Sequence, residues 1–529
     1  GLEVDKFNRD HVRSYINHYL TNYENILSKD LMGQKGIGYL LNDSFEALGA
    51  NWTEDILEEF QQRRGYDPLP WLPALTGKVV VDGPDSDRFL WDFRRTLSDL
   101  IVDEHYEEIS RALTPYDMQR YSESHEGMRA FPGDGMEVKR GAAVPMGAQW
   151  TGTGIIWNAD ILESASVAHV YGQNLVAAES FTAYGDSYNF SPSDLRATAD
   201  TMMINGVNRF VIHTSVHQPL DDFGPGFGLG PFGQWFTRHE TWAEQAHGWI
   251  SYLGRASHLL QQGRFAADIA WYYGDGTNIT DVYYNKRPPV APQGFRYDFI
   301  NGDILRNNLT TSDGIMHSSG GGQYKVLMIE PFAEITLASL KKIKEFKESG
   351  IIIVGNQPFA SPSLADNQIE YSRLANEIWA NANTKSSKVF TTLKQGLIAA
   401  DLTPSLEFKG EERQNPDLLY LQRTLPDADI FLIVNSGESQ ISTTALFNVI
   451  GKHPEKFDAV AGTQELMTFN QFGDRTEVPI ELGPGRSVFI VFDKNTKLTK
   501  WQKELLQEHL VTEIKSPWEV NFKKIGTLD

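Results

Sequence analysis

Short apolar segments alternate with longer amphipathic segments over the first half of the chain. In four of the longer segments apolar residues recur every three or four positions, which is the period of a helix buried on one face. These predicted helices cover residues 10–28, 54–64, 86–112 and 238–262. Short apolar runs that end in polar or acidic residues predict strands at residues 38–41, 118–122, 175–178 and 210–213. Parallel strands joined by helices, with polar residues collected after the strand ends, are typical of a (β/α)8 TIM-type barrel.

The visible units are too few for a closed barrel of this type, which needs eight strands. Only four or five are found, and the fifth depends on counting residues 2–5 as the end of another strand. Either further strands are missed within residues 1–264, or the first part of the barrel precedes Gly1. We favour the second interpretation. It makes residues 1–264 the C-terminal part of a catalytic barrel that an N-terminal segment of the same protein completes.

The pattern changes after residue 264, and two further domains are expected in this α/β multidomain chain. Apolar strands at residues 267–273, 324–329 and 350–354, with a helix over 337–348, predict a flavodoxin-like α/β sandwich domain over residues 265–400. Alternating apolar and polar residues then predict a β-sandwich domain over 401–529, with a polar tail that contains one helix.

Composition and charge exclude several classes of function. The chain has no cysteine, which excludes disulfides, a thiolate nucleophile and a cysteine-ligated zinc site. The net charge of −21 argues against a nucleic-acid partner, because binding to phosphate requires a basic surface. No apolar run is long enough to span a membrane, and the first five residues do not resemble a signal peptide. The residues themselves do not indicate a cellular location.

Two glutamates, Glu46 and Glu179, follow the ends of predicted strands. The C-terminal ends of barrel strands are where catalytic residues are found, and glycosidic bonds are cleaved by a pair of carboxylates. The two residues are 133 positions apart (179 − 46), so they belong to different strands. The sequence therefore predicts a catalytic pair. A capping or surface role for Glu46, and a salt bridge at a strand end for Glu179, are alternatives of about equal weight.

Polar and aromatic residues near these strand ends suit a sugar. Asn42 and Trp52 lie close to Glu46 in the sequence, and amide and indole groups match the hydroxyls and the C–H face of a pyranose. His213 and His217 follow another strand, where hydrogen bonds to sugar hydroxyls are favoured over zinc because a third ligand is missing. The loop 223–235, which includes Trp235, is either an aromatic lid or a rigid structural loop.

Acidic loop residues favour a calcium site. The segments 121–127 and 131–137 are rich in carboxylates, and hard oxygen ligands on loops favour Ca²⁺ over a transition metal. The candidate ligands are Asp43, Glu126 and Glu137. Their spacing does not match an EF-hand, so charged residues exposed to solvent are an equally good interpretation.

Several of these segments together resemble glycoside hydrolase family 106, the α-L-rhamnosidases. Leu41-Asn42-Asp43-Ser44-Phe45-Glu46 and Ala178-Glu179-Ser180 carry the two glutamates. The other segments that resemble the family are residues 51–53, 64–73, 166–174, 206–210, 212–219 and 230–236. The resemblance runs from Gly1 to about Arg264 and continues more weakly through the α/β domain. So many motifs in the same order make it specific.

The resemblance implies an inverting glycosidase with a (β/α)8 catalytic barrel and a Ca²⁺ ion that contacts rhamnose. Glu46 matches the general acid and Glu179 the general base. The implied partner is a rhamnose-containing oligosaccharide or polysaccharide, and the implied location is periplasmic or secreted. Trp150 or Trp52 would contact the methyl group of rhamnose. With these two, the candidate substrate-binding residues are Asn42, Trp52, His125, Trp150, His213, His217 and Trp235.

Two alternatives remain at this point. The first is a retaining glycosidase of a β-galactosidase-like family, in which the two carboxyl groups lie about 5–5.5 Å apart rather than 6.5–9.5 Å. The second is a carbohydrate-binding protein without catalytic activity. The presence of both candidate carboxylates favours an enzyme.

Overall fold

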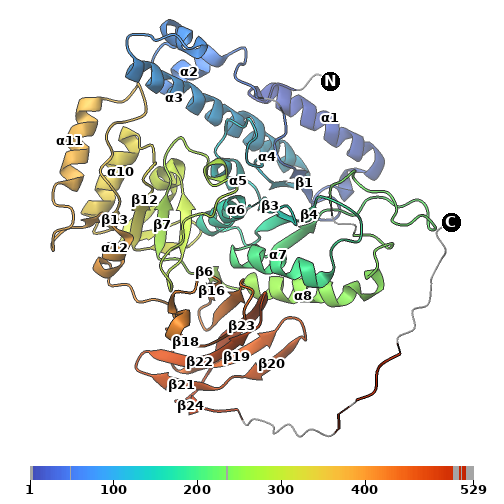
Figure 1. The fold of residues 1–529 in the computed structure, drawn as a ribbon. Helices are drawn as coiled ribbons and strands as arrows, with labels where there is room; N and C mark the ends of the chain where they lie inside the picture. The colour runs from blue at the N-terminus through green and yellow to red at the C-terminus, as the bar shows by residue number, and fades with distance from the viewer. Residues whose placement is uncertain are drawn as a thin grey trace.

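Five parallel strands form a curled half-barrel sheet in the first half of the chain (Figure 1). The computed structural model describes residues 4–47, 49–155, 157–233, 236–503, 512–513 and 515–519. The strands pair in chain order, each parallel to the next. They are β1 (Tyr39–Asn42), β2 (Gln119–Ser122), β3 (Val144–Thr151), β4 (Ala177–Ala183) and β5 (Arg209–Ile212). Among the described residues up to 263, these are the strands of the sheet.

Helices connect successive strands, except that α1 precedes β1 and α8 follows β5. They are α1 (Arg9–Leu27), α2 (Ile56–Arg64), α3 (Gly83–Leu100), α4 (Glu107–Leu113), α5 (Gly135–Arg140), α6 (Asn158–Tyr171), α7 (Pro192–Ile204) and α8 (Ala246–Leu260). Their starts follow from local chemistry: Asp82 caps α3 by accepting a hydrogen bond from the Asp85 amide, and Ser191 and Asp194 form a capping box at α7. The predicted helix 86–112 is present as α3, a wider π-helical turn over residues 101–106, and α4.

Two details of the first unit differ from the sequence prediction. Strand β3 was missed because it contains Pro145 and Gly147, residues that are rare in strands. Gly147 is required there: a Cβ atom would lie 2.8 Å from a carboxylate oxygen of Asp160. Val4 and Asp5 belong to no strand, and residues 1–3 lie outside the described part of the chain.

The second unit is a parallel sheet of five strands with helices beside it. Its strands are β7 (Ile269–Tyr272), β8 (Tyr297–Ile300), β12 (Val326–Ile329), β13 (Ile352–Val354) and β14 (Val389–Phe390), in the spatial order β8-β7-β12-β13-β14. Numbered along the chain, that order is 2-1-3-4-5, which is the flavodoxin-like order. The helices are α9 (Ile279–Val282), α10 (Leu337–Glu348), α11 (Gln368–Trp379) and α12 (Leu393–Ala399). A small antiparallel sheet, β9 (Thr310–Ser312), β10 (Ile315–His317) and β11 (Gln323–Tyr324), lies between β8 and β12 in the sequence.

The third unit consists of two antiparallel sheets. One contains β15 (Leu406–Phe408), β18 (Ile441–Phe447), β22 (Arg475–Leu482), β21 (Phe469–Phe472) and β24 (Lys500–Trp501). The other contains β20 (Thr463–Leu466), β19 (Lys452–Asp458), β23 (Arg486–Asn495), β17 (Asp429–Asn435), β16 (Leu418–Thr424) and β6 (Arg264–Phe265). The helix predicted in the C-terminal tail lies outside the described residues.

Strand β17 is buried on both faces, which explains its nearly continuous apolar sequence. Ile430, Leu432 and Val434 pack in one core with residues of α7 and α8. Phe431 and Ile433, which point to the opposite face, pack in the core between the two antiparallel sheets. The third unit is therefore joined to the half-barrel by a shared apolar core, and β6 adds the chain that follows α8 to the same sheet.

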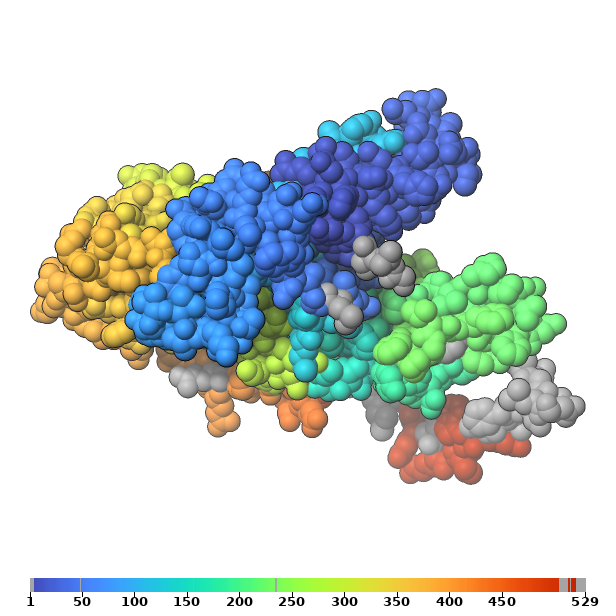
Figure 2. Space-filling view, turned by 90° about the horizontal axis from the view of Figure 1, so that it is seen from above, coloured from blue at the N-terminus to red at the C-terminus, as the bar shows by residue number. Residues whose placement is uncertain are grey.

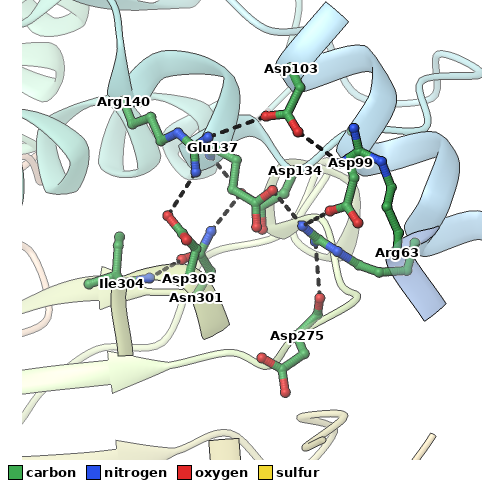
Figure 3. Close-up of polar contacts among 12 residues, drawn as sticks. Arg63, Asp99, Asp103, Asp134, Glu137, Arg140, Asp275, Asn301, Asp303 and Ile304 are labelled. Atoms are coloured by element: carbon green, nitrogen blue, oxygen red, sulfur yellow. Dashed lines mark hydrogen bonds and ion pairs between the residues drawn. The ribbon is translucent and has the colours of Figure 1, made fainter. Parts of the chain in front are cut away.

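A network of charged residues joins the half-barrel to the second unit (Figure 3). Arg95 donates to Glu137 (2.6 Å) and Asp99 (2.7 Å), and also to the carbonyl of Asp275 in the second unit (3.2 Å). Arg140 forms an ion pair with Asp303 at 2.9 Å. The Arg95–Glu137 pair is largely buried, so each partner depends on the other for compensation.

The two edge strands of the half-barrel face a common hollow. Residues of β1, β2 and β5 line a cavity of about 320 Å³: Tyr39, Leu41, Tyr121, Arg209, Phe210 and Val211. Tyr39 and Leu41 are about half exposed, although they belong to a strand. Figure 2 shows the N-terminal segment, in dark blue, and the segment that follows β5, in green, on either side of a hollow. Among the described residues, no helix is both long and apolar enough to cross a membrane.

We expect Arg95→Ala to destabilise the protein by about 3–5 kcal/mol, because the buried carboxylate of Glu137 would lose its partner. Arg94→Ala is the matched control: this neighbouring arginine is exposed, with no ion pair among the described residues, and its loss should change stability by no more than about 0.5 kcal/mol. Urea unfolding of both variants measures the difference. Equal midpoints for the two variants would contradict the importance of the network.

Candidate active site

Three carboxylates converge at the C-terminal ends of β1, β2 and β4. Asp43 follows β1, Glu123 follows β2 and Glu179 lies within β4. One oxygen atom from each lies within 4.8 Å of the others. Parallel strands bring these residues together because their C-terminal ends share one edge of the sheet. We call Asp43, Glu123 and Glu179 the acidic cluster.

A bulge in β4 orients Glu179. Opposite β3, Gln149 pairs with Ser180 but Trp150 pairs with Thr182, so Phe181 is the extra residue, and its φ is +69°. Without the bulge, residues 179 and 182 would point to opposite faces of the strand. With it, the hydroxyl of Thr182 donates a hydrogen bond to the carboxylate of Glu179. Phe181 is fully buried and stacks on Phe210, which fixes the bulge.

Burial and neighbouring negative charges disfavour the ionised forms of Glu123 and Glu179. Burial raises the pKa of Glu123 well above its usual value, and the charges of Glu179, Asp160 and Asp43 raise it further. Burial likewise raises the pKa of Glu179; the hydrogen bond from Thr182 acts in the opposite direction, while the charges of Asp43 and Glu46 add to the increase. The cluster therefore has an excess of negative charge that a bound cation would relieve.

Glu46 lies at the rim of the site, with its side chain 62% exposed. Arg129 donates to Glu46 (2.9 Å) and is 3.4 Å from Glu126. The other oxygen of Glu126 accepts a hydrogen bond from the indole of Trp150 at 3.2 Å. The electrostatic effect of Glu46 on Glu179 indicates that both glutamates belong to one polar region.

Two predicted binding residues, His213 and Asn42, are close to this region. His213 lies 3.9 Å from Glu179, and burial lowers its pKa, although the charges of Asp43 and Glu126 oppose the change. Asn42, the last residue of β1, has a buried side-chain oxygen without a hydrogen-bond partner among the described residues. His125 is buried, stacks on Phe131 and lies 3.4 Å from Asp281.

Other predicted residues are not brought to the acidic cluster. Glu137, a predicted metal ligand, lies in the first turn of α5, and its carboxylate pairs with Arg95 at 2.6 Å. Trp52 and His217 are exposed. Among the described residues, neither makes a contact with the acidic cluster. Trp235 lies outside the described residues.

Three residues of this region, Glu123, Arg129 and Thr182, were not predicted from the sequence. Glu123 had a usable signal: Asn42 of β1 is in register with Ser122 of β2, so Asp43 and Glu123 occupy equivalent positions just after their strands. No comparable signal exists for Arg129 or Thr182. One depends on a contact across 83 residues and the other on the bulge.

The donor atoms fit a hard divalent cation. The acidic cluster supplies carboxylate oxygens, and one oxygen each of Asn42 and Glu123 is buried without a hydrogen-bond partner among the described residues. All of these donors are oxygen atoms, which Ca²⁺ prefers, in sets of six to eight that often include water and ligand hydroxyls. Nitrogen or sulfur donors that would favour zinc or copper are not part of this set.

We expect Glu179→Gln to stabilise the protein at pH 8 in excess chelator. The raised pKa means that the ionised carboxylate is less stable in the folded state than in the unfolded chain. That cost is present above the folded pKa and disappears below the unfolded value of about 4.3, where the group is neutral in both states. The gain in urea midpoint should therefore shrink as the pH falls toward 4. Glu46→Gln, at an exposed position, is the control, and an unchanged or lower midpoint for Glu179→Gln at pH 8 would contradict the prediction.

Comparisons with known proteins identify the family of this chain. The model of glycoside hydrolase family 106, described as alpha-L-rhamnosidase, matches residues 1–471. A solved structure, a rhamnosidase from Novosphingobium sp. PP1Y, superimposes with a TM-score of 0.91 at 38% identity and covers 96% of this chain and 49% of that one. A curated relative from Formosa agariphila, named putative beta-glucuronidase, is 32% identical over 504 residues, which are 94% of this chain and 42% of the relative.

The chain thus spans a little under half the length of these two relatives. A more distant match, the GH42 beta-galactosidase Gan42B from G. stearothermophilus, has a TM-score of 0.59 at 11% identity and covers 92% of this chain and 82% of that one. This likeness concerns the fold alone. The match of the family model over most of the chain leads to one conclusion: this chain belongs to glycoside hydrolase family 106, the alpha-L-rhamnosidases.

Proposed function

We propose that this chain carries the catalytic residues of an enzyme that releases terminal α-L-rhamnose from an oligosaccharide, a polysaccharide or a glycoside. The observation that carries the proposal is the position of two glutamates: Glu179 lies in β4 and belongs to the acidic cluster, and Glu46 follows β1 and acts electrostatically on Glu179. The family and the similarity to a protein named as a rhamnosidase support it. Polysaccharides do not cross a membrane unaided, so we further propose a periplasmic or secreted location.

In the proposed reaction the two glutamates act with inversion of the anomeric carbon. Glu46, at the exposed rim, protonates the oxygen of the leaving group, and Glu179, in the interior, takes a proton from the attacking water. As the acid, Glu46 must carry the proton at the start of the reaction, and Arg129 contacts it at 2.9 Å. Because Arg129 also reaches Glu126, it has a second carboxylate to pair with when Glu46 takes up a proton.

We also propose that Ca²⁺ is part of the site. Asp43, Glu123 and Asn42 would hold it, and Glu126 lies close enough to contribute through its charge. The ion would supply fixed positive charge and a position where two neighbouring hydroxyls of the sugar can bind. Its charge would also help to keep Glu179 ionised, as a base must be.

The half-barrel, in our proposal, is closed by strands from a segment of the same protein outside this chain. The edge strands β1 and β5 line a shared apolar hollow, and an exposed apolar strand edge is a feature that proteins usually cover. The partial coverage of the two similar proteins supports the proposal. The closing strands would complete a (β/α)8 barrel around the acidic cluster.

Replacement of either glutamate by glutamine should lower kcat on 4-nitrophenyl α-L-rhamnoside by about 10²–10⁴-fold, because each change keeps the shape but removes proton transfer. ¹H NMR of the parent reaction should show β-rhamnose as the first product, as inversion requires. α-Rhamnose as the first product would favour the retaining alternative. Activity within a few fold of the parent in either variant would remove that residue from the mechanism.

Chelation should abolish activity, and added Ca²⁺ should restore it, because the acidic cluster would lose its compensating charge. Asp43→Asn should raise the Ca²⁺ concentration needed for half-maximal activity. Glu137→Gln is the matched control, since that carboxylate lies in the network with Arg95 and its loss should leave the calcium requirement unchanged. Full activity in excess chelator, with no metal found by elemental analysis, would refute the proposal.

A further inference from the structure

A second cavity lies beside the acidic cluster, at the C-terminal ends of β3 and β4. Its volume is about 400 Å³, which is ample for one sugar or aryl ring. The described residues that line it are Glu126, Trp150, Gly152, Thr153, Ile155, Trp157 and Tyr184. We call it the aromatic pocket. The residues of the acidic cluster are not among those that line it, so it is a separate cavity at the same end of the sheet.

Aromatic rings hold each other in place around this pocket. Trp150 and Trp157 stack with centroids 5.8 Å apart and planes 22° apart. The ring of Phe232 meets both Trp150 (5.8 Å) and Tyr184 (5.6 Å) at steep angles. Trp157 is 7% exposed, whereas Tyr184 is 62% exposed. The pocket therefore combines a rigid aromatic wall with one ring that is open to solvent, an arrangement suited to stacking against a flat apolar face.

The contacts of Glu126 connect this pocket to Glu46. One oxygen of Glu126 accepts from Trp150 in the wall of the pocket, and the other lies 3.4 Å from Arg129. Arg129 in turn donates to Glu46 at 2.9 Å. This chain of contacts places the pocket on the side of Glu46. If Glu46 protonates the leaving group, the leaving group lies on that side.

The charge of the pocket restricts what it can hold. Glu126 is the charged residue among those that line it, so the pocket presents a negative charge beside apolar rings. A carboxylate or sulfate on the ligand would be repelled at this position. A neutral group with a flat apolar face would keep its contacts with the rings without that cost.

We propose that the aromatic pocket is the leaving-group subsite and that it selects substrates whose group next to rhamnose is neutral and presents a flat apolar face. That face is either an aryl ring or the C–H face of a neutral pyranose. The proposal rests on the proposed role of Glu46 as the acid. It predicts specificity at the group that is released, which the roles of Glu46 and Glu179 do not determine.

Binding of neutral probes tests the pocket without any need for turnover. Phenyl β-D-glucoside and methyl β-D-glucoside are titrated into the parent protein, Tyr184→Ala and Tyr188→Ala, with tryptophan fluorescence or calorimetry as the readout. We expect Tyr184→Ala to weaken binding of the phenyl glucoside about 3- to 10-fold. Tyr188→Ala is the matched control, because Tyr188 is also exposed but is not among the residues that line the pocket. An effect on both glucosides assigns the pyranose face, and an effect on the phenyl glucoside alone assigns the aryl ring.

Two further titrations distinguish this proposal from a pocket that accepts a charged group and from a pocket that holds rhamnose. Phenyl β-D-glucuronide should bind more weakly than phenyl β-D-glucoside, and Glu126→Gln should reduce that difference. L-Rhamnose should not displace the phenyl glucoside; displacement would mean that the pocket holds rhamnose itself, and would overturn the assignment. So would the absence of probe binding, or equal binding to the parent and Tyr184→Ala. Probe binding in a protein that does not hydrolyse rhamnosides would instead refute the proposed function and leave the pocket as a binding site.

Discussion

The buried ammonium group of Lys139 stabilises the residues that pack behind the acidic cluster. Lys139 is fully buried, and its Nζ atom donates to Asp160 (2.6 Å), Glu163 (2.8 Å) and Ser164 (2.9 Å). The second oxygen of Asp160 accepts from the backbone amide of Ala148, which is paired with Glu179 in the next strand. Two buried carboxylates would be untenable without the lysine, so the position of β3, and with it the register of β4, depends on this charge.

The same group also influences the chemistry above it. The charge of Asp160 raises the pKa of both Glu123 and Glu179, and the charge of Lys139 opposes it at Glu123. Close packing around the pair leaves little freedom: a Cβ atom at Gly135 would lie 2.0 Å from Glu163, and one at Gly147 would lie 2.8 Å from Asp160. The packing around Lys139, Asp160 and Glu163 is therefore determined mainly by the compensation of their charges.

The sequence was informative wherever a local rule decides the structure. Glu46 and Glu179 were predicted to lie in one region because polar residues near the ends of parallel strands share one edge of the sheet. The half-barrel was predicted because most of its strands are apolar. Strand β3 was not predicted because glycine is rare in strands. Gly147 is required there by the close approach of Asp160, which strand propensity does not reveal. Thr182 was not predicted because one inserted residue changes which face of the strand it occupies. The pairing of Glu137 with Arg95 was not predicted because the two residues lie 42 positions apart in the chain. Such contacts depend on the tertiary fold, which periodicity does not contain.

The burial of β17 on both faces limits how this chain can change over evolutionary time. A pair of antiparallel sheets at the end of a chain resembles an accessory module that recombination could remove or exchange. Here Ile430, Leu432 and Val434 complete the core of α7 and α8, so its loss would expose the apolar side of helices that support β4. The two antiparallel sheets must therefore be inherited together with the half-barrel, and a transplanted pair of sheets would have to match the surface of α7 and α8 residue by residue.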